Sequence, residues 1–167
     1  IINSIKELEK LSQKISSKNL TKSNSSLELA NWLNEVPVIY YPNGFQAVAI
    51  RFKNSLQENS KIHAIAEEVL ETCHNGIVSW ESDEKFKPIL IKGKNDHPKT
   101  KERWKILGKY FNSKKIEYKE IISVNGNILS KVINLIYHLD YTSIYLAVIN
   151  QKDPSPVYAI NFIKKKL

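Results

Sequence analysis

Three side chains in this sequence could together carry out proton-transfer chemistry: a carboxylate, an imidazole and an ammonium group. Glu58 lies in the segment RFKNSLQENSK, which covers residues 51–61. His74 begins a His-Asn pair, and Lys164 belongs to the basic run near the end of the sequence. A carboxylate can move a proton between adjacent carbons beside a carbonyl, while an imidazole and an ammonium group can open and close a sugar ring. The three groups therefore predict proton-shuttle chemistry on a sugar.

The segments around these residues resemble the bifunctional phosphoglucose/phosphomannose isomerases. RFKNSLQENSK is similar to the family signature R-W/F-K-x-x-x-x-E-N-x-K, and the separation between Glu58 and His74 also fits the family pattern. The resemblance continues through VPVIYYP, DHPKTKER, LDYTSIYLA and DPSPVYAINFIKKKL. It implies the C-terminal, second sugar isomerase (SIS) domain of that family. The implied fold class is α/β, with three layers and a mainly parallel sheet flanked by helices on both faces.

The resemblance also implies a role for each residue. Glu58 is the base that moves a proton between C1 and C2 through a cis-enediol(ate), which interconverts glucose 6-phosphate or mannose 6-phosphate and fructose 6-phosphate. His74 opens and closes the ring and is lent by the neighbouring subunit of a homodimer. Lys164 matches the last position of the family pattern D-P-x-P-x-x-x-I-x-x-L-K and acts with His74. No metal or organic cofactor is implied.

One half of the family's site has no counterpart in this sequence. The family's first SIS domain carries a Ser/Thr/Gly-rich loop that holds the sugar phosphate, and no such loop is visible here. The arginine that stabilises the enediolate also belongs to that first domain. We therefore expect the N-terminal SIS domain of the same enzyme as a partner, an isolated chain with little or no activity, and substrate-binding residues that this sequence does not identify. The implied place in metabolism is glycolysis and gluconeogenesis.

Simpler explanations exist for each residue. Glu58 falls off the apolar stripe of its helix, so it faces away from this domain's core; a cleft shared with another domain would reconcile that position with catalysis. His74 is a loop histidine, and lysines near a helix C-terminus are ordinarily explained by the helix dipole. Cys73 next to His74 does not predict a Cys/His dyad, because adjacent side chains usually diverge. A non-catalytic SIS module that binds or senses sugar phosphates is the alternative, since fold alone does not decide function.

Hydrophobic periodicity and turn residues predict alternating strands and helices, which favour a parallel sheet between two helical layers. The stripe Phe45, Val48, Ala49, Phe52 and Leu56 predicts an amphipathic helix. We divide the chain into N-terminal helices and a linker at 1–34 and the SIS domain at 35–167. The other expected elements are helices at 2–15, 27–33, 62–71, 96–111 and 128–149 and from 156 onward, and strands at 36–41, 87–91 and 116–124.

Composition bounds the remaining possibilities. The chain has 167 residues, 42% of them hydrophobic, which is enough for one compact core. Its formal net charge of +8 comes from Lys and Arg spread along the sequence, which indicates a solvated surface and no nucleic-acid partner. The single cysteine argues against a disulfide and a Cys-based zinc site. Polar residues interrupt the 128–149 segment, and the first residues do not resemble a signal peptide, so we expect a cytoplasmic protein without membrane contact.

Overall fold

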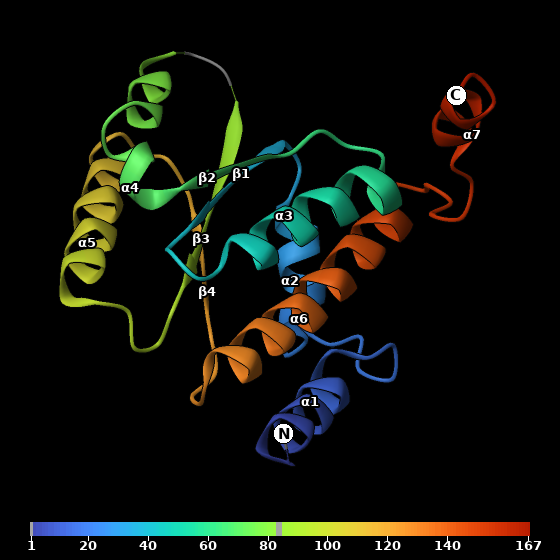
Figure 1. Cartoon of the computed structure of the whole chain (residues 1–167), viewed down its shortest axis with the longest axis horizontal. Coiled ribbons are helices and arrows are strands. Elements are labelled where there is room, and N and C mark those ends of the chain that lie inside the picture. Colours follow the sequence, from blue (N-terminus) through green and yellow to red (C-terminus); the bar gives the residue numbers. More distant parts are fainter. Residues whose placement is uncertain (1, 83–84) are drawn as a thin grey trace.

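The computed structural model describes residues 2–82 and 85–167 and has a parallel sheet between two layers of helices (Figure 1). The strand order is β2-β1-β3-β4, and each neighbouring pair is parallel. This arrangement confirms the expected α/β class with helices on both faces. The strands are β1 (Val36–Tyr41), β2 (Ile65–Glu68), β3 (Phe86–Lys92) and β4 (Lys119–Ile122).

Alternating side chains of the two central strands supply both hydrophobic cores. Ile39 and Ile89 point to one face, where they pack with α2 (Ser25–Trp32), α3 (Gln46–Ser55) and α6 (Ile128–Ile149). Tyr40 and Leu90 point to the other face, where they pack with α4 (Val69–Thr72) and α5 (Pro98–Ser113). Both faces of β1 and β3 are therefore covered, as expected for apolar, β-branched strands in a parallel sheet.

Helix α6 is long and apolar enough, by length and composition alone, to cross a membrane. In this fold Leu135, Leu139 and Leu146 lie in the core cluster, and α6 packs against α1 (Ile2–Ile15), α2 and α3. The 128–149 segment is apolar nearly all round, which predicts a buried helix; the structure buries one side of it, while Val148 stays exposed. Burial of these leucines stabilises the fold by roughly 1.5–3 kcal/mol each.

The N-terminal segment is tied to α6 by specific contacts. Tyr137 donates a hydrogen bond to Ser12 Oγ (3.1 Å), and Tyr145 donates one to the carbonyl of Ile15 (2.7 Å). Asn24, which is fully buried, also donates to that carbonyl (3.1 Å) and accepts from Leu27 N as the N-cap of α2. Helix α1 therefore joins the layer that covers α6 (Figure 1).

Two expectations about secondary structure need correction. The segment 62–71 was expected to be helical, but residues 65–68 form β2 and only 69–72 form α4. Pairing with β1, in the register Val38 with Ile65 through Tyr41 with Glu68, stabilises the extended form, and such tertiary pairing overrides a local helical preference. The strand expected at 116–124 is shorter, since only residues 119–122 pair with β3. After the left-handed residue Lys115, the N–H of Ile116 still bonds to the Phe111 carbonyl at the end of α5 (2.9 Å).

Candidate functional site

Glu58 lies on a single π-helical turn, η1 (Leu56–Ser60), which continues directly from α3. The predicted stripe of α3 is confirmed, since Val48, Phe52 and Leu56 are fully buried. Glu58 itself is exposed, on the side facing away from the core, as its position off the stripe predicted. The turn ends at Lys61, which has a left-handed φ of 59°. A wide last turn that closes at a left-handed residue is a common way for a helix to end.

The backbone of η1 is anchored to α6 although the Glu58 side chain is exposed. Asn59 Nδ2 donates to Ser143 Oγ (2.8 Å), and Ser60 Oγ donates to the Ser143 carbonyl (2.7 Å). Ser60 and Ser143 are fully buried. Hydrogen bonds among buried groups are costly to break. The turn that carries the Glu58 carboxylate is therefore held in place by the two residues that follow Glu58.

Arg51, in the same motif, is occupied by an internal contact. Its guanidinium donates two hydrogen bonds to Asp140, at 3.2 and 2.9 Å, and Ser55 Oγ donates to the same carboxylate at 2.8 Å. The hydrogen bond and charge of Asp140 raise the pKa of Arg51. This network fastens α3 to α6 just before η1. Sequence reasoning missed Asp140, and the paired charges at positions 51 and 140 gave no local signal of their contact.

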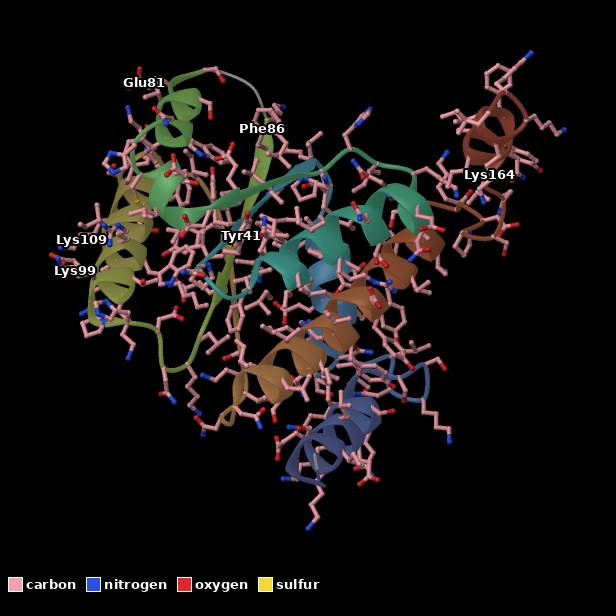
Figure 2. All side chains as sticks on the ribbon, viewed as in Figure 1. Tyr41, Glu81, Phe86, Lys99, Lys109 and Lys164 are labelled. Atoms are coloured by element: carbon pink, nitrogen blue, oxygen red, sulfur yellow. The ribbon has the colours of Figure 1, made fainter. Side chains whose placement is uncertain are left out.

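Lys164 lies on α7 (Tyr158–Lys164), a helix that has no buried residue. Figure 2 shows Lys164 on this helix, which protrudes from the end of the molecule where α6 finishes. The apolar side chains of α7 are largely exposed; Tyr158 retains 80% of its accessible surface and Phe162 retains 66%. A helix with this much exposed apolar surface has contact area available for a partner.

Lys61 ties η1 to the segment that leads into α7. Its Nζ donates to the carbonyls of Glu58 (2.6 Å) and Pro156 (2.8 Å). A groove of about 250 Å³ runs along this contact, with Glu58 and Lys61 on one side and the residues 156–160 on the other. The structure therefore brings the carboxylate and the helix that carries Lys164 to the same end of the molecule.

His74 is not part of this arrangement. It lies between α4 and η2 (Gly76–Glu81), with its backbone N–H bonded to the Glu71 carbonyl at 2.9 Å and its side chain exposed. In Figure 1, α4 and α7 lie on opposite sides of the molecule. One chain therefore groups Glu58 with the α7 helix and leaves His74 on a distant surface.

The loop around His74 is closely packed on its inner side. A Cβ at Gly76 would lie 2.3 Å from Glu67 Oε2, so this carboxylate occupies the space beside the glycine. Thr72 Oγ1 donates to the same Glu67 oxygen at 3.2 Å. Any larger residue at position 76 would displace Glu67. The backbone that follows the His-Asn pair is thereby held against β2.

The thiol of Cys73 lies next to His74 in the sequence. Burial, as the largest cause, raises the pKa of Cys73, which disfavours a reactive thiolate. Within the described residues, His, Cys, Asp and Glu side chains do not gather in groups of three or more that could hold a metal ion. The groups available for chemistry at the η1 groove are therefore carboxylate and ammonium groups.

Comparison with known proteins identifies the family to which this geometry belongs. Residues 22–167 match the family described as bacterial phospho-glucose isomerase C-terminal SIS domain. The bifunctional phosphoglucose/phosphomannose isomerase of Caldicellulosiruptor bescii is 34% identical over 155 residues, which cover 90% of this chain and 44% of that protein. The bifunctional phosphoglucose/phosphomannose isomerase of Aquifex aeolicus is 29% identical over 144 residues, covering 84% of this chain and 45% of that protein.

Solved structures share the fold at low sequence identity. A glucose-6-phosphate isomerase like protein from Thermus thermophilus has a TM-score of 0.72 at 18% identity, covering 90% of this chain and 50% of that chain. Tagatose-6-phosphate ketose/aldose isomerase from Escherichia coli has a TM-score of 0.66 at 9% identity, covering 93% of this chain and 46% of that chain. The chain spans less than half the length of the curated relatives that it matches. This chain belongs to the bacterial phosphoglucose isomerase C-terminal SIS domain family.

Proposed function

We propose that this chain is the C-terminal half of a cytoplasmic, homodimeric sugar-phosphate isomerase that interconverts glucose 6-phosphate or mannose 6-phosphate and fructose 6-phosphate. The observation that supports it best is the groove in which Glu58 faces the start of α7. The exposed apolar side chains of α7 leave room for a further half of the enzyme beside that groove. The curated relatives are named phosphoglucose/phosphomannose isomerases, which supports the same substrates.

In the proposed mechanism Glu58 removes the proton from C2 of the open-chain aldose phosphate. The electron pair left at C2 forms the C1–C2 double bond of a cis-enediol(ate). The proton of the C2 hydroxyl passes to the carbonyl oxygen at C1, which becomes a hydroxyl group and leaves the enediolate oxygen on C2. Glu58 returns the proton to C1, and the oxygen at C2 becomes the ketone of fructose 6-phosphate. Atoms and electrons balance without an external oxidant or reductant.

Ring opening and closing fall to His74 and Lys164 in this proposal. The ring oxygen must gain a proton as the C1–O bond breaks and lose it when the ring closes. The two residues lie on opposite sides of one chain, so His74 would come from the neighbouring subunit. The phosphoryl group and the enediolate are held by the N-terminal SIS domain, which is why we propose little or no turnover by this chain alone.

Replacing Glu58 by Gln in the complete two-domain enzyme tests the assignment. Gln keeps the size and hydrogen-bonding capacity but lacks the basic carboxylate, so kcat should fall by about 10²-fold or more while substrate binding survives. Exchange of the C2 proton of glucose 6-phosphate with deuterated solvent should disappear as well. Glu9→Gln, on the exposed surface of α1, is the matched control and should retain normal exchange.

Two outcomes would contradict the proposal. Near-normal turnover and exchange in Glu58→Gln would make Glu58 an ordinary surface residue. Binding of glucose 6-phosphate without any exchange by the unaltered complete protein would instead support the non-catalytic module that binds or senses sugar phosphates.

A further inference from the structure

A second polar cavity lies at the carboxyl edge of the sheet, separate from the groove beside α7. It has a volume of about 650 Å³ and opens between the end of β1, the end of β2 and the first turns of α5. Glu58, His74 and Lys164 do not line it. Its polar lining comes from Tyr41, Asn43, Gln46, Glu68, Thr100 and Arg103.

The position of this cavity follows from the strand order. β1 and β3 are neighbours, but the helices that follow them cover opposite faces of the sheet. Phe52 of α3 packs on the face of Ile39, whereas Trp104 of α5 packs on the face of Tyr40. When the connections after two neighbouring strands go to opposite faces of the sheet, they leave a crevice outside the carboxyl ends of the strands. Open α/β sheets bind ligands in such crevices. The volume is within the usual range of small-molecule sites, about 300–1,000 Å³.

Two opposite charges line this cavity without an ion-pair partner among residues 2–82 and 85–167. The ion pairs of that part of the chain include neither Arg103 nor Glu68. Arg103 Nη1 donates one hydrogen bond, to the Lys99 carbonyl at 3.2 Å, so the rest of its guanidinium is available. Because the two charged groups share a cavity without contacting each other, a ligand can lie between them.

The chemistry of the lining selects the kind of ligand. A guanidinium binds a phosphoryl group through two parallel N–H groups, and Thr100 adds a hydroxyl donor beside it. The Glu68 carboxylate would repel a simple polyanion but accepts hydrogen bonds from sugar hydroxyls. Asn43 and Gln46 supply amides that both donate and accept. Burial raises the pKa of Tyr41, so its phenol keeps the proton that it can donate.

We propose that this cavity is a second site that binds a phosphorylated monosaccharide without converting it. Arg103 holds the phosphoryl group, and Glu68, Asn43 and Gln46 bind the hydroxyl groups. The site rests on residues that the proposed isomerase mechanism does not use. Its existence is therefore independent of whether Glu58 acts as the base.

Titration of the 167-residue chain with D-glucose 6-phosphate tests the site, with D-glucose and inorganic phosphate as comparison probes. Amide NMR shifts should move at residues 41–47, 68–70 and 100–103. Each comparison probe should bind at least about tenfold more weakly than D-glucose 6-phosphate. Arg103→Gln should weaken binding by about tenfold or more, because a charge-assisted contact is lost. Glu68→Gln should weaken the binding of D-glucose 6-phosphate but not the binding of inorganic phosphate.

Matched variants separate this site from general electrostatic attraction and from the proposed active site. Lys109→Gln removes one positive charge from an exposed position of the same helix (Figure 2) and should change the affinity by less than about twofold. Glu58→Gln should leave this binding intact. If Arg103→Gln does not fold, Glu68→Gln still provides the test.

Several results would overturn the proposal. One is no binding, and another is shifts that gather around Glu58 and α7. Equal affinity for inorganic phosphate and glucose 6-phosphate would reduce the cavity to an anion site. Equal weakening by Lys109→Gln and Arg103→Gln would assign the binding to overall charge. Loss of binding in Glu58→Gln would place it at the proposed active site instead.

Discussion

His138 is buried in the middle of α6, and only 7% of its surface is accessible. Its Nε2 contacts Ser25 Oγ at 2.8 Å, and burial lowers its pKa to about 4. An unfolded chain binds a proton at this residue below pH 6.5, whereas the folded chain remains neutral until about pH 4. The free energy of unfolding should therefore decrease as the pH falls from about 6.5 to 4, by about 3 kcal/mol over the whole interval.

Urea unfolding at several pH values, compared between variants, checks this expectation. His138→Gln removes the titrating group, so its stability should depend less on pH between about 6.5 and 4. His63→Gln, which replaces an exposed histidine, should keep the dependence of the unaltered chain. An unchanged pH dependence in His138→Gln would mean that other groups control acid unfolding.

At the scale of single residues, sequence periodicity was a good guide to exposure but not to contacts. The stripe of α3 predicted that Phe52 is buried and that Glu58 faces away from the core, and both hold in the structure. The ion pair between Arg51 and Asp140 joins positions far apart in the chain. No local pattern records such a pair, because its cause is the packing of α3 on α6. The catalytic roles of Glu58, His74 and Lys164 stay predictions.

At the scale of elements, the sequence predicted the central strands, which are largely buried, more accurately than the edge strand β2. β1 and β3 are runs of buried residues, and such runs indicate central strands of a parallel sheet. β2 has four residues, IAEE, and three of these are only partly buried. Its composition does not distinguish a short edge strand from a helix, and its pairing with β1 is what makes the segment a strand. The division of the chain at residue 35 also stays a prediction.

The helices at the two ends should contribute very differently to stability. Helix α1 buries Ile15 completely and bonds to Tyr137 and Tyr145, whereas α7 buries none of its residues. Removing residues 1–15 should cost about 4 kcal/mol, from lost apolar burial and hydrogen bonds. Removing residues 153–167 should change the free energy of unfolding by about 0.5 kcal/mol or less. Urea unfolding of the two shortened chains measures the difference, and equal losses would show that α7 packs on the domain in solution.

At the scale of the whole molecule, exposed charged and apolar side chains gather at one end of the domain. Glu58 and the exposed apolar side chains of α7 lie at that end, and the curated relatives are more than twice as long as the matched segments. An enzyme built from two such domains could place this groove against its other half. The surface after α4 that carries His74 lies on the other side of the molecule from α7 (Figure 1) and would then face a second subunit.

The separation of Glu58 from His74 leads to a test by subunit complementation in the complete enzyme. Glu58→Gln and His74→Asn should each be nearly inactive as pure homodimers. A mixed dimer has one site in which an intact Glu58 meets an intact His74 from the other subunit, and one site with both changes. Random exchange of equal amounts makes half of the dimers mixed, so activity should recover to about a quarter of the unaltered level. Assay of glucose 6-phosphate isomerisation before and after subunit exchange gives the result. Recovery after exchange would establish the shared site, whereas two stable inactive variants that exchange subunits without any recovery would show that both groups act within one chain.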